Sequence, residues 1–173
     1  MKIREAIKED LPELLDIYNE AIRTLTATFD LKEQTLEERR VWFEQHNNHY
    51  PLITAEVDNQ VVGYCSLSPY QPKAAYAYTA ELSVYLSAKF QGRGIGTHLV
   101  KEILKRAKQL KFHSVIAIIT SGNDGSVRLH ERLGFTYMGH LKEAGLKFGE
   151  WQDIYFYQLM IAGSASQESK PNS

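Results

Sequence analysis

Apolar and polar residues recur along the chain with two different periods, and each period predicts one kind of element. Four segments place apolar side chains three or four residues apart, which is typical of helices with one buried face. The other segments alternate apolar and polar residues or join β-branched residues in a run, which is typical of strands. The predicted order is strand, two helices, three strands, helix, strand, helix and two strands, in the ranges 2–6, 8–24, 35–46, 50–57, 60–68, 78–87, 96–110, 113–120, 123–134, 135–144 and 150–161.

Short-range signals set the expected ends of several elements. Asp10 is a candidate cap for the first helix. Thr35 begins the second helix, and Glu38 follows three residues later, which is the spacing of a capping box. The last two strands are expected to join through Gly145 and Gly149.

Apolar runs predict which side chains fill the core. The β-branched run at 113–120 is expected to be a strand buried on both faces. Cys65 lies in an apolar run and is interpreted as a buried small hydrophobe rather than a catalytic thiol. Other expected core positions are Leu36, Val41, Trp42, Leu99, Val100, Ile103, Leu104, Ala107, Trp151, Phe156 and Tyr157.

Length and composition favour one domain. The chain has 173 residues, of which 43% are hydrophobic, and this suffices for one core but not comfortably for two. This length and composition, together with the element order, predict a single-domain α/β fold with a mixed sheet and helices on both faces. Residues 1–162 are expected to form this domain, and the small polar residues 163–173 are expected to form a disordered tail.

The charge balance argues against several partner classes. Lys plus Arg (20) nearly equals Asp plus Glu (21), so no excess positive field marks the chain for nucleic acid or an anionic membrane. No apolar run approaches the roughly 18 residues that span a bilayer. The chain start does not resemble an export signal, and the single cysteine cannot form an internal disulfide. We therefore expect a cytoplasmic protein with a small neutral or mixed-charge ligand.

A glycine-rich loop, Q-G-R-G-I-G-T at 91–97, separates a predicted strand from a predicted helix. Its backbone N–H groups and the helix N-terminus can converge on an anion, and Arg93 adds a charge-assisted donor. Glycine allows a phosphate to approach the amides and permits positive φ. A P-loop would need Lys and then Ser or Thr after the last glycine, and a Rossmann fingerprint would need different spacing early in the chain. A tight turn with no ligand is the remaining alternative.

Two motifs make the chain resemble the GNAT superfamily of N-acetyltransferases. Q-G-R-G-I-G resembles that superfamily's pyrophosphate loop, Q/R-x-x-G-x-G/A, and N-D-G-S-V-R-L-H-E-R-L-G-F resembles its N-x-x-S/A helix leading into L-G-F. More narrowly, A-Y-T-A-E-L-S-V-Y-L-S and G-L-K-F-G-E-W-Q-D-I-Y-F-Y-Q-L resemble the phosphinothricin and methionine sulfoximine N-acetyltransferase group. The resemblance covers most of residues 1–161 in the right order. It implies a mostly antiparallel twisted sheet, and acetyl transfer from acetyl-CoA to a primary amine without a metal.

The resemblance also implies which residues hold acetyl-CoA. The strand before the glycine loop is expected to present backbone N–H groups to the thioester carbonyl where neighbouring strands splay apart. Asn123 and Ser126 are expected to contact the pantetheine arm, although as plain sequence they equally form a turn and a helix cap. The implied cofactor-binding residues are Val84, Tyr85, Leu86, Gln91, Gly92, Arg93, Gly94, Ile95, Gly96, Thr97, Asn123 and Ser126.

Acetyl transfer to an amine needs a base, because an α-amine with a pKa of about 8 is partly protonated at neutral pH. Glu81 is the candidate, since it is a carboxylate in an otherwise apolar and hydroxylic strand and matches the group's catalytic glutamate. A solvent-facing or ion-paired glutamate is the alternative. His130 stands where most of the superfamily has a tyrosine that assists the departing thiolate, and it either assists the thiolate or is a surface histidine.

Acceptor recognition is expected near the segment before Ala77-Tyr78 and near Phe29. Here Gln71 and Lys73 replace the arginine or aromatic residue common in the group, which leaves acceptance of phosphinothricin itself open. The expected substrate-binding residues are Phe29, Gln71, Lys73 and Ser83. The resemblance implies a homodimer acting on a small amino-acid-like amine. The alternatives are acetylation of a protein N-terminus or lysine, and a non-catalytic acyl-CoA-binding module.

Overall fold

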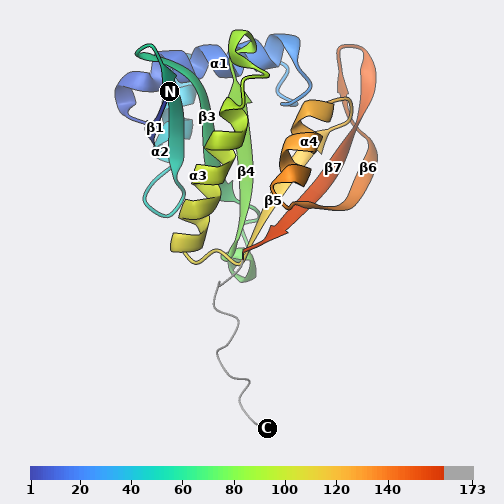
Figure 1. Cartoon of the computed structure of the whole chain (residues 1–173). Helices are drawn as coiled ribbons and strands as arrows, with labels where there is room; N and C mark the ends of the chain where they lie inside the picture. Colours follow the sequence, from blue (N-terminus) through green and yellow to red (C-terminus); the bar gives the residue numbers. More distant parts are fainter. Residues whose placement is uncertain (162–173) are drawn as a thin grey trace, which may run out of the picture.

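A computed structural model describes residues 1–161, in which one seven-stranded sheet carries helices on both faces (Figure 1). The predicted tail at 163–173, and residue 162, lie outside the described residues. The predicted element order is confirmed. The strands are β1 (Lys2–Glu5), β2 (Leu52–Val57), β3 (Gln60–Pro69), β4 (Thr79–Leu86), β5 (Ser114–Thr120), β6 (Thr136–Lys147) and β7 (Glu150–Met160), and the α-helices are α1 (Leu11–Thr24), α2 (Leu36–Glu44), α3 (Ile95–Gln109) and α4 (Asp124–Arg132).

The sheet has the strand order β1-β2-β3-β4-β5-β7-β6. Its neighbouring strands are antiparallel except for β4 and β5, which run parallel. In Figure 1, α3 and α4 lie in front of the sheet and α1 and α2 lie behind it. The mixed, mostly antiparallel sheet with helices on both faces is therefore as predicted.

The pairing of β4 with β5 is short. It runs from Thr79 opposite Ser114 only to Glu81 opposite Ile116, although both strands continue further. Beyond Glu81, the edge of β4 that faces β5 has no strand partner within residues 1–161. Figure 1 shows the two strands diverging towards the end where α3 begins. This gap is the splay that the sequence resemblance implied.

The main core lies between the sheet and α3. The predicted stripe on that helix is confirmed, since Leu99, Val100, Ile103 and Ala107 are buried. Cys65 is also buried in this core, as predicted. Burial raises the pKa of its thiol far above the ordinary value, which excludes a reactive thiolate.

The two predicted helix caps have different outcomes. Thr35 caps α2 as predicted, and its hydroxyl accepts a hydrogen bond from the backbone N–H of Glu38 at 3.2 Å. Asp10 precedes α1 but makes no cap hydrogen bond. Its carboxylate instead accepts hydrogen bonds from the guanidinium of Arg4 at 2.8 and 2.9 Å and from the N–H of Ile7 at 2.8 Å. The ion pair with β1 takes both oxygens away from the helix.

The core prediction for α2 is wrong for two of its three residues, since only Trp42 is partly buried and packs against the core. Leu36 and Val41 are exposed, whereas Arg39 is only 2% exposed. The Arg39 guanidinium lies 3.3 Å from the ring centroid of Trp42 and 4.2 Å from that of Tyr18. Aromatic faces attract a guanidinium, so this helix buries a cation where the apolar pattern predicted aliphatic side chains.

Three further expectations about strands are corrected. The run at 113–120 is not buried on both faces, because Ile118 is 38% exposed where β5 leaves β4. Trp151 is 62% exposed, whereas Tyr157 is buried as predicted and Phe156 is half-buried. Gly145 does not join the last two strands, since β6 continues to Lys147 and the turn lies at Phe148 and Gly149.

Candidate active site

The glycine loop has the backbone that anion binding requires. Gly92 and Gly94 have φ of +73° and +78°, and α3 begins at the next residue, Ile95. Side-chain-bearing residues rarely adopt such φ angles, so glycine is needed at both positions. The N–H groups of residues 92–97 have no acceptor within residues 1–161. They form an unsatisfied cluster of donors at the positive end of a helix.

Gly96 is required for a different reason. Its φ is ordinary, but a Cβ there would lie 3.0 Å from Cδ1 of Leu129 and 3.5 Å from Cδ1 of Leu86. Those atoms belong to α4 and to the last residue of β4. The absence of a side chain at Gly96 therefore lets the start of α3 pack closely between its neighbours.

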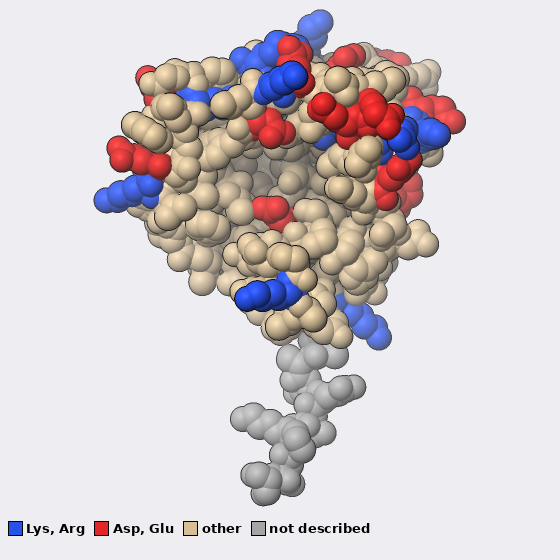
Figure 2. Space-filling model, turned by 180° about the vertical axis from the view of Figure 1, so that it is seen from behind, with Lys and Arg blue, Asp and Glu red and all other residues tan. Residues whose placement is uncertain are grey.

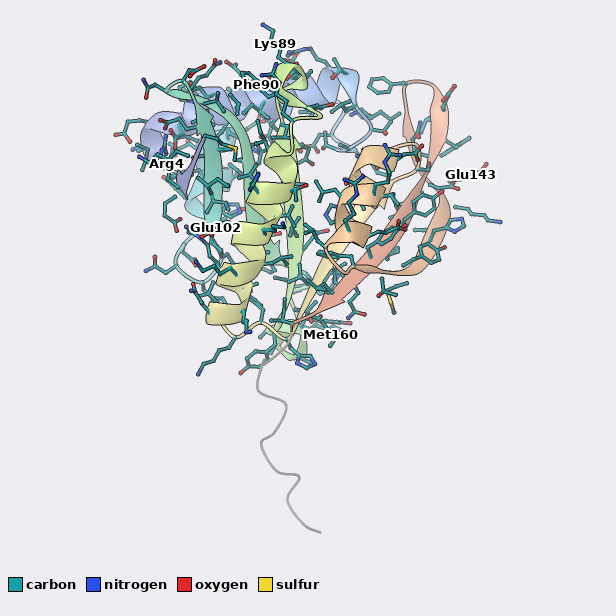
Figure 3. The ribbon with its side chains drawn as sticks, viewed as in Figure 1. Arg4, Lys89, Phe90, Glu102, Glu143 and Met160 are labelled. Carbon is teal, nitrogen blue, oxygen red and sulfur yellow. The ribbon has the colours of Figure 1, made fainter. Side chains whose placement is uncertain are left out.

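A cavity of about 480 Å³ opens at the glycine loop. Its walls are the end of β4, the start of α3, one side of α4 along its length and the segment 25–27. Among the residues predicted to bind the cofactor, only Arg93 is not part of its lining. The Arg93 guanidinium lies 5.0 Å from the ring centroid of Phe90, which Figure 3 shows at the end of the molecule where α3 begins.

The cavity also contains residues that the sequence prediction missed. Arg128 and Arg132 line it from α4, and Leu25, Thr26 and Ala27 line it from the loop after α1. The two arginines could have been predicted to line the site. They are four residues apart and so share one helix face, and their helix directly follows Asn123, which was predicted to bind the cofactor. No local pattern distinguished the segment 25–27.

At the start of α4, one hydrogen-bond chain links three predicted residues. The Asn123 side chain caps the helix, and its Oδ1 accepts from the N–H of Ser126 at 3.4 Å. The carbonyl oxygen of Ser126 lies 2.7 Å from Nδ1 of His130. Because a carbonyl can only accept, Nδ1 carries a proton.

His130 is a buried residue rather than the surface histidine held as an alternative. It is 2% exposed, and its Nε2 has no hydrogen-bond partner within residues 1–161. Burial lowers the pKa of the imidazole, and this effect outweighs the hydrogen bond to Ser126, which favours protonation. The neutral ring therefore presents an unprotonated Nε2.

A second, small cavity of about 50 Å³ lies in the gap between β4 and β5. Ser83 and His130 line it together with Ile118, the residue that the gap leaves exposed. Residues that line both this cavity and the larger one are Ala27, Val84, Tyr85, Asn123 and Ser126. The two spaces therefore meet where β4 and β5 separate.

Glu81 lies on β4 at the last position paired with β5. Its side chain shares a face with Ser83, two residues further along, and the rise over two residues is about 6.6 Å. Glu81 lines neither the larger cavity at the glycine loop nor the small cavity in the gap. It is half-buried, and its carboxylate has no hydrogen-bond or ion-pair partner within residues 1–161. Burial alone raises the pKa of Glu81 above its ordinary value.

The face of the sheet that carries α1 and α2 is hollowed. Figure 2 shows this hollow near the centre of the face, with acidic side chains at its border. Ser83 and Tyr85 share the face with Glu81, and Tyr85 packs with residues of α1. The hollow lies on the side of the sheet opposite α3 and α4.

The predicted acceptor residues are not all brought together. Ser83 lines the small cavity, and the ring of Phe29 packs against Gly145. Gln71 and Lys73 are exposed in the loop that leads into β4, and they line neither cavity. Their loop enters β4 at the end nearer Glu81, whereas the glycine loop follows the other end.

Other features of the described residues do not add to this site. A cavity of about 470 Å³ lies between the end of α2 and the second half of α3, and it contains none of the predicted site residues. Within residues 1–161, no group of three or more His, Cys, Asp or Glu side chains is placed to hold a metal ion. Among the helices of this part of the chain, none is long and apolar enough to cross a membrane.

Comparison with known proteins shows which family of proteins this chain resembles. The model of the Acetyltransferase (GNAT) family matches residues 12–135. An L-methionine sulfoximine/L-methionine sulfone acetyltransferase of Pseudomonas paraeruginosa is 37% identical over 92% of this chain and 94% of its own length. A phosphinothricin N-acetyltransferase of Streptomyces viridochromogenes is 39% identical over 91% and 86%.

A solved structure shows the same fold with a ligand. The GNAT superfamily phosphinothricin acetyltransferase of Sinorhizobium meliloti, in complex with acetyl-CoA, has a TM-score of 0.92 and 32% identity, covering 99% of this chain and 93% of that one. The chain belongs to the GNAT acetyltransferase family. It is an N-acetyltransferase that uses acetyl-CoA as the acetyl donor. The family resemblance stated from the motifs is thereby confirmed.

Proposed function

We propose that the protein transfers an acetyl group from acetyl-CoA to the primary amine of a small amino-acid-like substrate, with Glu81 as general base. One observation carries the proposal. The cavity of about 480 Å³ at the glycine loop, here called the donor cavity, meets the small cavity at the gap between β4 and β5, and an unpaired carboxylate with a raised pKa stands beside that gap. Such a carboxylate is suited to accept a proton from an incoming amine.

Glu81 acts on the amine directly or through one water, since it stands beside the small cavity rather than in its wall. Its isolation from cations leaves it basic, and its half-buried position brings its pKa closer to that of the amine. Ser83, which lines the cavity, separates the carboxylate from the reacting centre and can hold the substrate or that water.

The unpaired edge of β4 binds the carbonyl oxygen of the acetyl donor. Backbone N–H groups from Leu82 onwards that face the gap meet no strand there, so they can donate to the carbonyl oxygen as it gains negative charge. Acetyl-CoA supplies the activated acyl group, and the glycine loop with its unsatisfied N–H groups holds the diphosphate.

We assign His130 an orienting role in the small cavity. With a proton on Nδ1 and a lowered pKa, the neutral ring has no proton to give at Nε2. Nε2 can accept a hydrogen bond, which holds a neighbouring group in place. The proton removed from the amine therefore passes to Glu81, and the thiolate receives its proton from solvent.

The substrate class rests on the relatives together with this site. The Pseudomonas and Streptomyces relatives are named for methionine sulfoximine, methionine sulfone and phosphinothricin, which are all small amino acids. The test is release of free thiol from acetyl-CoA with each of these amines, with other small amino acids, and with a peptide that has a free N-terminus. Turnover of a small amino acid supports the proposal. Turnover of the peptide alone would place the chain among protein acetyltransferases, and tight acetyl-CoA binding without turnover would indicate a silent module.

The two arginines of α4 should contribute to donor binding. Replacing both Arg128 and Arg132 by Ala is expected to raise the Michaelis constant for acetyl-CoA about tenfold, because each cation lines the cavity that holds phosphate groups. The turnover number should change little, since these groups are remote from the reacting carbonyl. The effect of the substitutions should shrink at high salt, and equal effects on both parameters at any salt would contradict this role.

We also propose that the protein is a homodimer and is cytoplasmic. Large apolar side chains are exposed along β6 and β7, among them Met138, Leu146 and Trp151. Exposed apolar side chains on an edge hairpin are typical of an interface. Light scattering after size exclusion is expected to give twice the 19.8 kDa chain mass, and Trp151→Glu is expected to shift the protein towards one chain mass. A monomeric wild type would refute the dimer.

The proposed cytoplasmic location rests on Cys65, because its buried free thiol is suited to a reducing compartment.

A further inference from the structure

Three strands hold the loop after α1 by its carbonyl oxygens. The Thr120 hydroxyl on β5 donates to the carbonyl of Thr26 at 2.7 Å, and the Tyr85 hydroxyl on β4 donates to that of Ala27 at 3.2 Å. Lys147, near the end of β6, donates from Nζ to the carbonyls of Leu25 at 2.7 Å and Thr28 at 2.8 Å. Four successive carbonyls are therefore fixed by the sheet.

Lys147 is the charged member of this set and is only 3% exposed. Within residues 1–161 it has no ion pair with a carboxylate, and the two carbonyls are its hydrogen-bond partners. Burial lowers the pKa of its ammonium, and Asp30 acts in the opposite direction. Burying a cation is costly unless its donors are satisfied, so the loop carbonyls must keep their positions for Lys147 to remain inside.

Gly145, two residues before Lys147 on the same strand, holds the next part of the loop. A Cβ on Gly145 would lie 2.6 Å from Cε2 of Phe29 and 2.8 Å from its Cδ2. Alternate residues of a strand share a face, so one side of β6 receives both the Phe29 ring and the backbone just before it. The end of β6 thus sets both the path of the loop and the position of its aromatic side chain.

This loop forms part of the site. Leu25, Thr26 and Ala27 line the donor cavity, and Ala27 also lines the small cavity at the gap. We propose that Lys147 is a positioning residue, which shapes the junction of the two cavities by holding the carbonyls of Leu25 and Thr28. The expected kinetic effect rests on the proposed function. The tether, meaning the hydrogen bonds from Lys147 to the carbonyls of Leu25 and Thr28, belongs to the fold and does not depend on that function.

The experiment compares Lys147→Met with the wild type, because Met keeps the unbranched apolar stem and removes the donors. Amide hydrogen exchange of the segment 25–30 is expected to accelerate about tenfold or more. The dissociation constant for acetyl-CoA and the Michaelis constant for the amine are expected to rise about tenfold, with the turnover number within about threefold of wild type. Thr120→Val, which removes the bond to Thr26, should act in the same direction with a smaller effect.

A matched control separates positioning from loss of stability. Phe112→Leu alters a buried core residue outside the site and should lower the melting temperature without changing exchange in 25–30 or acetyl-CoA affinity. Unchanged exchange and affinity in Lys147→Met would overturn the inference, as would equal changes in the Phe112 variant. If the wild type binds acetyl-CoA but acetylates no amine, the proposed function fails, while exchange and acetyl-CoA affinity still decide the tether.

Discussion

Replacing Glu81 by Gln is expected to lower the turnover number about 100-fold, because the amide cannot take a proton from the attacking amine. The Michaelis constant for acetyl-CoA should stay near the wild-type value, since Glu81 lines neither cavity. Steady-state kinetics with a saturating amine measure both parameters. A turnover number within threefold of wild type would make Glu81 a structural residue.

The pH dependence adds a second readout for Glu81. Burial raises the pKa of this carboxyl above its ordinary 4.5, so the base form is lost as the pH falls through that higher value. Wild-type activity should therefore fall on the acidic side, and the limb that belongs to Glu81 should be missing from the residual activity of the Gln variant. An identical acidic limb in both proteins would assign it to another group.

The ionisation of Glu81 has opposite effects on stability and on activity, because the charged form is active but costs stability. With a pKa higher in the folded than in the unfolded state, the stabilisation gained by protonating Glu81 is fully present below pH 4.5 and is lost as the pH rises through the folded value. At pH 8 the wild type therefore carries the cost of a half-buried charge, which Gln removes. We expect the Gln variant to melt at the same or a higher temperature, so that its low activity cannot be attributed to unfolding.

Replacing Gly94 by Val is expected to weaken acetyl-CoA binding about 50-fold or more, as measured by calorimetry. The φ of +78° is unfavourable for a β-branched residue, and relief of that strain would turn the loop amides away from the diphosphate. No atom lies within 4 Å of the position of a Cβ on Gly94, so the protein without ligand should still fold.

The matched control for Gly94 is Gly139→Val. Gly139 also has positive φ (+145°) and no atom within 4 Å of an added Cβ, but it lies on β6 outside both cavities. Its substitution should lower stability without changing acetyl-CoA affinity. A Gly94 variant that binds acetyl-CoA as tightly as the wild type would remove the glycine loop from the binding site.

Sequence patterns predicted the fold because each element carries its own local period. The stripe on α3, the cap at Thr35 and the glycines before α3 each depend on residues a few positions apart, so one sequence suffices to read them. The residues predicted to bind the cofactor come from two strand-to-helix connections, and all of them except Arg93 line one cavity.

Features that depend on contacts between distant segments could not be predicted. Arg39 is buried because Tyr18 and Trp42 enclose it, and no periodicity marks a guanidinium for the core. Ile118 is exposed because β5 leaves β4, which its own β-branched run does not reveal. Lys147 reaches the Leu25 carbonyl across 122 positions of sequence, so the loop 25–28 gave no local sign of its place in the site.

The early separation of β4 from β5 also has a kinetic consequence. In the proposed function, acetyl-CoA occupies the cavity lined by α3 and α4, and the amine enters from the hollow on the face of α1 and α2, so the two ligands use separate entrances. Neither has to depart before the other arrives. This geometry suits a ternary complex and the exchange of spent coenzyme without release of the second product, and it makes a covalently acetylated enzyme unnecessary.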